Sequence, residues 1–221
     1  MIRIILLICF SAAGAAAQTP PSPAEIASYN GLHLAAHLGD LAEIGRLAAN
    51  GASLEERDGH GRAPVHIAAY ASNDDALRAL AEAGAQMNSL EGQAYDVVTI
   101  AAVADDPELM SLAISLGNDP GLTTSPYEGT ALIAAAHLGH DEVVRRLIEA
   151  GAPLDHINNL GWTALIEAVI LGDGGPRHQR VVKALVESGA DKELADRQGR
   201  TPLQLAEMAG YVVIADIIRG N

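Results

Sequence analysis

A repeat of about 33 residues constrains this chain more than any other feature of its sequence. A glycine followed by a small or polar residue recurs at Gly51-Ala52, Gly84-Ala85, Gly117-Asn118, Gly151-Ala152 and Gly189-Ala190. The steps between these pairs are 33, 33, 34 and 38 residues. A second marker keeps the same spacing, as RAPVHIAA from Arg62, DVVTIAA from Asp96, TALIAAA from Thr130, TALIEAV from Thr163 and TPLQLAE from Thr201. A fixed period of this length indicates a solenoid, in which each unit packs only against its neighbours.

These motifs resemble the ankyrin repeat, whose signature is a Thr-Pro-Leu-His-x-Ala run on a period of about 33 residues. The stretch GLHLAAHLGD from Gly31 is the same unit without its front end. The resemblance implies an all-α, ankyrin-repeat solenoid of about six stacked helix-turn-helix units with short connecting hairpin loops. The units are approximately 28–57, 58–91, 92–125, 126–159, 160–196 and 197–221.

The local signals within each unit agree with helix pairs. Thr201-Pro202 places a capping hydroxyl before a proline at the first helical position, and paired alanines keep the first helix thin. Acidic residues at the start of the second helices are interpreted as capping groups: Asp40, Asp74, Asp106 and Asp141. The third unit has GQAYDVV in place of the usual front, which makes it the expected weak point of the array.

The residues ahead of the repeats have two predicted roles. SPAE at 22–25 has the pattern of a capping box, which predicts a short helix that ends near Asn30 and shields the first repeat. Residues 18–27 form a flexible tail and the start of this capping helix. Residues 1–17 have the order of a signal peptide, with Arg3, an apolar stretch too short to span a membrane, and small residues for cleavage after Ala17. A buried first helix and a lipid anchor at Cys9 are the alternatives. Export predicts a periplasmic or secreted protein.

The composition limits the partners of the mature chain. The formal net charge is −14, and it becomes −15 once Arg3 is removed, so nucleic acid and anionic lipid are unfavourable partners. We expect no membrane insertion after signal cleavage, and a soluble monomer. Cys9 is the single cysteine and lies in the leader, so the mature chain has neither disulfides nor a thiol nucleophile.

The glycine-rich stretch LGDGGPRH at 171–178 raises the question of a phosphate-binding loop. It follows a predicted helix rather than a strand, and it lacks the Lys-Ser/Thr pair of a P-loop. Alignment of the valine pairs at 143–144 and 181–182 places the extra five residues of the fifth unit between its two helices. The stretch is therefore interpreted as an enlarged helix–helix loop. Small-anion binding, or catalysis, at 172–178 through Arg177 and His178 stays a rival hypothesis.

The sequence gives no pattern of catalytic or metal-ligating residues. Of the eight histidines, His33 and His66 occupy the Thr-Pro-Leu-His position, where the resemblance implies hydrogen bonds to neighbouring turns. His37 and His137 share a repeat position but lie three units apart, and His140 is at the start of a second helix. His60, His156 and His178 are in separate loops with no partner four residues away. We expect no metal site, no cofactor and no enzyme activity.

The ankyrin resemblance implies that another protein binds the loop tips and the exposed, concave side of the first helices. Tryptophan, tyrosine and arginine are the residue types that dominate binding energy at interfaces. The predicted partner-binding residues are Arg62, Tyr70, Tyr127, His137, Leu138, Trp162, Arg177, His178, Arg197 and Arg200. The alternative for Trp162 is packing over the next loop.

The sequence thus predicts a non-enzymatic, exported ankyrin-repeat scaffold or adaptor that binds a protein partner. A periplasmic inhibitor or immunity protein for a toxin or enzyme is an alternative that would use the same surface.

Overall fold

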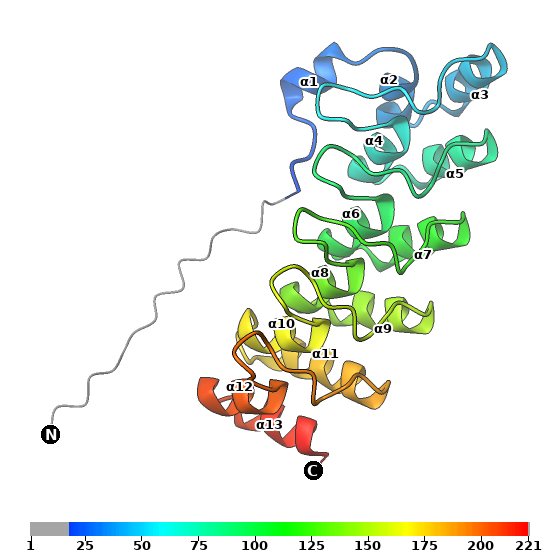
Figure 1. The fold of residues 1–221 in the computed structure, drawn as a ribbon. Helices are drawn as coiled ribbons and strands as arrows, with labels where there is room; N and C mark the ends of the chain where they lie inside the picture. The colour runs from blue at the N-terminus through cyan, green and yellow to red at the C-terminus, as the bar shows by residue number, and fades with distance from the viewer. Residues whose placement is uncertain (1–17, 221) are drawn as a thin grey trace, which may run out of the picture.

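The structure is a computed structural model and describes residues 18–220. The predicted signal peptide lies outside the described residues. Within them the chain forms one short helix followed by six antiparallel helix pairs, which stack into a column (Figure 1). The helices are α1 (Pro23–Ser28), α2 (Gly31–Leu38), α3 (Leu41–Ala49), α4 (Pro64–Tyr70), α5 (Asp74–Glu82), α6 (Val97–Val103), α7 (Pro107–Ser115), α8 (Ala131–Leu138), α9 (Asp141–Glu149), α10 (Ala164–Ile170), α11 (Pro176–Glu187), α12 (Pro202–Ala209) and α13 (Val212–Arg219).

Two layers of helices follow from the repeat. The first helices α2, α4, α6, α8, α10 and α12 pack in sequence against one another, and α3, α5, α7, α9, α11 and α13 form the second layer. Small alanine pairs on the first helices, such as Ala101 and Ala102, are fully buried and allow this close approach. The second helices bury aliphatic residues such as Leu80 and Leu147 against them. Apolar burial between units therefore holds the column together.

Four of the six first helices follow a residue whose side chain caps the helix, and α2 and α4 follow Asn30 and Ala63 without such a bond. The side chains of Thr130, Thr163 and Thr201 accept hydrogen bonds from backbone N–H groups three residues later, and Asp96 does the same in the third unit. The predicted capping box at Ser22 is also present, with Glu25 bonded back to the Ser22 N–H.

The second helices differ in the residue that precedes their first turn. Asp40 and Asp106 cap α3 and α7 as predicted, each accepting from a backbone N–H. The prediction was wrong for Asp74 and Asp141, which lie one residue inside their helices. The residue before each of them bonds to the preceding unit: His140 Nδ1 to the Ala102 carbonyl (2.8 Å) and Asn73 Nδ2 to the His37 carbonyl (2.6 Å).

The irregular third unit replaces the missing signature residues with other polar contacts. Asn118 donates to Asp96 (2.7 Å) and accepts from the Val98 N–H (3.2 Å). Thr99 occupies the usual histidine position, and its hydroxyl is 2.9 Å from the hydroxyl of Thr124. These contacts join the unit to its own exit loop, and they lie among buried residues.

The extra residues of the fifth unit are divided between a loop and a helix. Five residues separate α10 from α11, whereas two separate α8 from α9. The helix α11 has 12 residues and α9 has 9, because Pro176 starts α11 early and adds most of one turn. The prediction that all of the excess forms a loop is therefore wrong in part. We call residues 171–178 the inserted turn.

Candidate partner-binding surface

Each connecting loop ends in a hairpin tip that is built in the same way. The hairpin tips are residues 58–62, 91–95, 125–129, 158–162 and 196–200. The first residue of each tip accepts hydrogen bonds from the backbone N–H groups two and four residues later. The fourth residue has a positive φ, and glycine occupies it except at Ala94 and Glu128. A polar side chain thus fixes the conformation of every tip.

Neighbouring tips are also joined to one another. The Gly92 N–H donates to the His60 carbonyl (2.9 Å), and the Asn159 N–H donates to the Tyr127 carbonyl (2.9 Å). Between the last two tips, the Arg197 guanidinium donates to the Asn159 carbonyl. The tips therefore form a connected row along one side of the column, and Arg197 is part of its construction.

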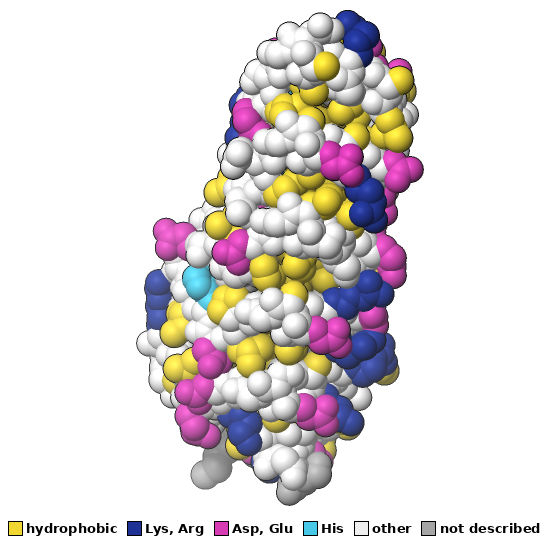
Figure 2. Space-filling model, turned by 90° about the vertical axis from the view of Figure 1, so that its right-hand side faces the viewer, with side chains coloured by type: hydrophobic (Ala, Val, Ile, Leu, Met, Phe, Trp, Pro, Cys, Tyr) yellow, Lys and Arg dark blue, Asp and Glu magenta, His cyan; other side chains and the backbone are white. Residues whose placement is uncertain are grey.

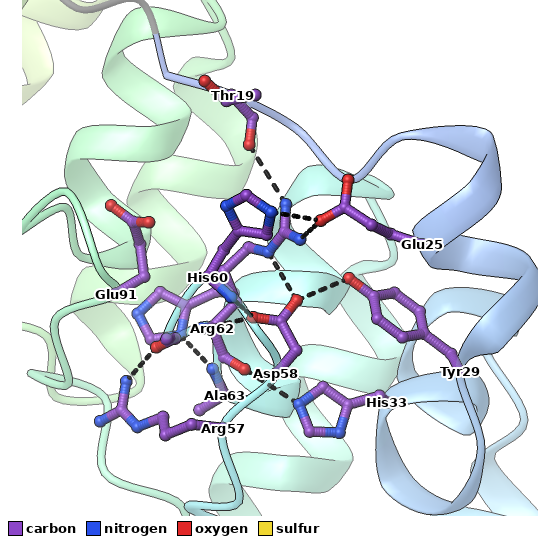
Figure 3. Close-up of polar contacts among 12 residues, drawn as sticks. Thr19, Glu25, Tyr29, His33, Arg57, Asp58, His60, Arg62, Ala63 and Glu91 are labelled. Atoms are coloured by element: carbon purple, nitrogen blue, oxygen red, sulfur yellow. Dashed lines mark hydrogen bonds and ion pairs between the residues drawn. The ribbon is translucent and has the colours of Figure 1, made fainter.

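Arg62 lies inside the protein rather than at the surface (Figure 3). Its side chain is 1% exposed, and Nε donates to Asp58 Oδ2 at 2.7 Å. Nη2 bonds the Glu25 carboxylate, and Nη1 is 3.3 Å from the Thr19 carbonyl. The prediction that Arg62 contacts a partner was wrong, because the N-terminal segment folds over it.

The carboxylates around Arg62 are held in the ionised form. The side-chain and backbone hydrogen bonds of Ser22, and then Arg62, lower the pKa of Glu25 to about 2. Burial opposes ionisation of Asp58, but hydrogen bonds from the Arg62 and His60 N–H groups and the Tyr29 hydroxyl outweigh it and lower its pKa to about 2. The Tyr29 hydroxyl is 2.8 Å from Asp58 Oδ2. The network joins α1 to the first hairpin tip.

The histidines of the signature position are buried and hydrogen-bonded, as predicted. His33 Nε2 is 2.9 Å from the Arg62 carbonyl. His66 Nδ1 accepts from the Ala63 N–H (3.0 Å), so Nε2 carries the proton and donates to the Ser89 carbonyl (2.8 Å). Burial lowers the pKa of His66 to about 4. This imidazole is therefore neutral at pH 7 and structural.

Tyr70 also differs from its prediction. The ring packs against the core and is half-buried, and the buried hydroxyl has no hydrogen-bond partner among residues 18–220. Burial and the nearby Glu91 raise the pKa of this hydroxyl. Tyr70 therefore offers a partner little more than a ring edge.

The tips of the fourth, fifth and sixth units present the predicted aromatic and basic side chains. Tyr127 and Trp162 are half-buried, and Trp162 packs against the core. Arg200 pairs with Asp196, and its side chain is 32% exposed. Its exposure distinguishes Arg200 from Arg62, which occupies the equivalent position four units earlier.

An apolar row crosses all of the units at the turn between their two helices. The position eight residues after the cap of each first helix is apolar throughout the array. We call these residues the turn row: Leu38, Ala71, Ala104, Leu138, Leu171 and Ala209. The three leucines are 66%, 41% and 40% exposed, respectively. Leu138 was predicted as a contact, and the repeat register places Leu38 and Leu171 at the same position of their units.

Polar contacts connect the turn row with the hairpin tips in the fourth and fifth units. His137 Nδ1 lies 3.4 Å from the Glu167 carboxylate, and the other oxygen of Glu167 accepts from Asn158 Nδ2 at 2.7 Å. Glu167 is 5% exposed, at a position that Ile67 and Ile100 fill in earlier units. Glu167 on α10 thus links the tip at Asn158 with the end of α8 at His137 through buried contacts.

The inserted turn does not form an anion site. Arg177 donates to Asp105 (2.7 Å) and Asp141 (3.3 Å), so two carboxylates already occupy its guanidinium. His178 is buried, with Nδ1 2.9 Å from Asp173 and Nε2 3.0 Å from the His137 carbonyl. Anion binding by these two residues was therefore the wrong interpretation. Arg177 instead bridges the third, fourth and fifth units.

The opposite side of the column, where the second helices lie, has a different surface (Figure 2). Hydrophobic side chains form separate bands across it, and acidic and basic side chains line its margins. In residues 18–220 no helix is long and apolar enough to cross a membrane. Over the same range, no group of three or more His, Cys, Asp or Glu side chains is placed to hold a metal ion.

A column of helix pairs with stacked hairpin tips defines a repeat protein of the ankyrin class, and comparisons with known proteins agree. The family model for ankyrin repeats (3 copies) matches residues 98–196. An ankyrin repeat domain from Acinetobacter baumannii AYE, solved by crystallography, is 38% identical with a TM-score of 0.80, over 86% of this chain and 96% of that one. The chain belongs to the ankyrin repeat family.

One further relative matches a smaller part of this chain, and one further solved structure has a lower sequence identity. The ankyrin repeat protein YahD of Escherichia coli (strain K12) is 36% identical over 113 residues, which are 50% of this chain and 56% of that protein. A chain in the structure of a predatory endopeptidase from Bdellovibrio bacteriovorus in complex with an immunity protein has a TM-score of 0.71, over 88% of this chain and 99% of that one. Its 22% identity shows a common fold alone.

Proposed function

We propose that this chain is an exported, non-enzymatic module that binds another protein through the turn row and the hairpin tips of units four to six. The observation that carries the proposal is the turn row, since leucines at one repeat position remain 40–66% exposed in a chain of net charge −14. Exposed apolar side chains that recur at one face of a protein are candidate sites of protein association, and Leu138 and Leu171 occupy this position in neighbouring units. The ankyrin fold is typically a binding scaffold.

The basic and aromatic residues of the last tips complement this apolar row. Trp162, Arg197 and Arg200 lie at the same end of the array as Leu171. The contacts of Glu167 with Asn158 and His137 connect the two regions. An apolar centre with a polar rim is the usual anatomy of a protein interface. Because the last tips are held by hydrogen bonds, the surface is ordered before a partner binds.

The test is affinity capture with the tagged chain from periplasmic and whole-cell extracts. The bait is compared with a variant in which Leu138 and Leu171 are both replaced by aspartate. The matched control is Lys183→Asp, whose side chain is 60% exposed on α11. We expect a discrete partner that the control retains and the double variant loses, with all three baits equally helical by circular dichroism. Capture that is unaffected by the double variant would reject the proposed surface.

A periplasmic inhibitor or immunity protein would use the same surface and differ only in the effect on its partner. The endopeptidase–immunity protein structure shares this fold, so the fold is compatible with such a role. Export and a monomeric state are parts of the same proposal. Cell fractionation and light scattering test them, and loss of the captured partner's activity on binding would favour inhibition.

A further inference from the structure

The chain contains the same aspartate–arginine hairpin tip twice. In the first, Asp58 accepts from the Arg62 N–H through Oδ1 (2.9 Å) and from Arg62 Nε through Oδ2 (2.7 Å). Asp196 and Arg200 form the same two bonds at 2.9 Å and 2.7 Å. Both aspartates are largely buried, so each arginine is oriented by a fixed carboxylate. The two tips are equivalent in sequence register and in these two hydrogen bonds.

The first tip already holds a ligand, which is the N-terminal segment of the chain itself (Figure 3). The Glu25 carboxylate lies between Arg62 Nη2 and His60 Nε2, and the second of these contacts measures 3.0 Å. The Thr19 carbonyl lies 3.3 Å from Arg62 Nη1. A carboxylate and a backbone carbonyl from one short segment thus occupy the outer edge of the guanidinium.

The second tip carries no such segment among residues 18–220. Gln198 stands at the position of His60, and its side-chain oxygen is 3.1 Å from Arg200 Nη2, which also lies 2.6 Å from Asp196 Oδ2. Within residues 18–220 the Arg200 side chain makes its hydrogen bonds through Nε and Nη2, and it is 32% exposed. Arg197 lies on the same tip and bonds the Asn159 carbonyl. The tip therefore carries an oriented, accessible guanidinium.

We infer that the tip at 196–200 binds an extended, carboxylate-bearing segment of the protein partner, in the manner of Thr19 and Glu25 at Arg62. The inference rests on the proposed role as a protein-binding module and specifies the chemistry of its partner. The partner's carboxylate would pair with Arg200, and the Gln198 amide would turn to donate to it, as His60 does. A planar guanidinium held by a buried aspartate is well suited to carboxylate recognition.

The probe is a synthetic peptide of residues 18–28, acetylated and amidated, titrated into the full chain. The chain's own segment is tethered beside Arg62 and excludes the peptide there by its high effective concentration. Arginine Nε–Hε resonances report binding, and Arg200→Lys assigns the Arg200 signal. The matched peptide carries Gln in place of Glu25. Lys183→Ala serves as a control protein.

We expect the Arg200 signal to move in a saturable way at millimolar peptide, with at least fivefold weaker binding for the Gln peptide. In Arg200→Lys, which has no Arg200 signal, the Arg197 signal of the same tip reports binding, and it should also be at least fivefold weaker. An unmoved Arg200 signal, equal shifts with both peptides, or a shift confined to Arg62 would each overturn the inference. The readout needs no captured partner, so a failed capture and a failed titration are distinguishable. If a partner is captured through the turn row but the peptide does not bind, the proposed function holds and the inference about the tip at 196–200 is wrong.

Discussion

Replacement of Arg62 by methionine should destabilise the protein far more than the same change at Arg200. Methionine retains an unbranched apolar side chain, so the change removes mainly the charge and its hydrogen bonds. The Arg62 side chain is 1% exposed and pairs with both Asp58 and Glu25, so Arg62→Met leaves these two carboxylates without their common cation. Removal of one partner from a buried ion pair costs about 3–5 kcal/mol. Replacement of Arg200, which is 32% exposed, leaves one carboxylate without its cation. This is the buried Asp196, which keeps its hydrogen bonds from the Gln198 and Arg200 N–H groups, so the loss should cost about 1–2 kcal/mol.

The free energy of unfolding of each variant follows from urea denaturation monitored by circular dichroism. A double-mutant cycle of Arg62→Met with Glu25→Gln isolates the contact between these two side chains. Hydrogen exchange of residues 18–28 should accelerate in Arg62→Met and stay unchanged in Arg200→Met, because Arg62 holds the N-terminal segment. Equal losses of stability in the two methionine variants, within about 0.5 kcal/mol, would refute the role assigned to burial.

The structure predicts the effects of four further substitutions. Folding lowers the pKa of His66 from 6.5 to about 4, so between these pH values the folded protein keeps this imidazole neutral. The unfolded state binds a proton there that the folded state does not, so the free energy of unfolding falls as the pH decreases below 6.5. The loss should approach about 3 kcal/mol at pH 4 by urea midpoint, and His66→Gln should remove this part of the slope. Glu128 has φ 55° where Gly161 and Gly199 stand in later tips, so Glu128→Gly should increase the free energy of unfolding by about 0.5–1 kcal/mol and raise the melting temperature. Gly161→Ala should lower it, since a Cβ there would lie 2.7 Å from Arg197 Cγ. Arg177→Ala should cost at most about 1 kcal/mol, and the difference from wild type should shrink in high salt because the ion pairs are exposed.

The repeat made the fold predictable, whereas long-range contacts decided which site residues are exposed. The 33-residue spacing and the threonine caps are local signals, and the helices begin where they indicate. Arg62 was misplaced because the segment that covers it lies 37 residues earlier in the chain. His178 was misplaced because its ring bonds the turn of the preceding unit, 41 residues away. No periodicity reports such contacts.

The inserted turn and the turn row also show which features local sequence signals predict and which depend on long-range contacts. The glycine run predicted additional residues between two helices, but Pro176 converts several of them into helix. The exposure of Leu38 and Leu171 was accessible from the repeat register, because every unit has an apolar residue at that position. The burial of Glu167 was not, since its partners His137 and Asn158 come from α8 of the preceding unit and from a hairpin tip.

Photo-crosslinking in living cells tests binding through the turn row most directly. A photoreactive amino acid is placed at Leu138 or Leu171, and in separate controls at Lys183 or Glu187, which are exposed on α11. The proposed function predicts one discrete adduct from both turn-row positions and none from the controls. Absence of an adduct at both leucines, or equal adducts at all four positions, would contradict it.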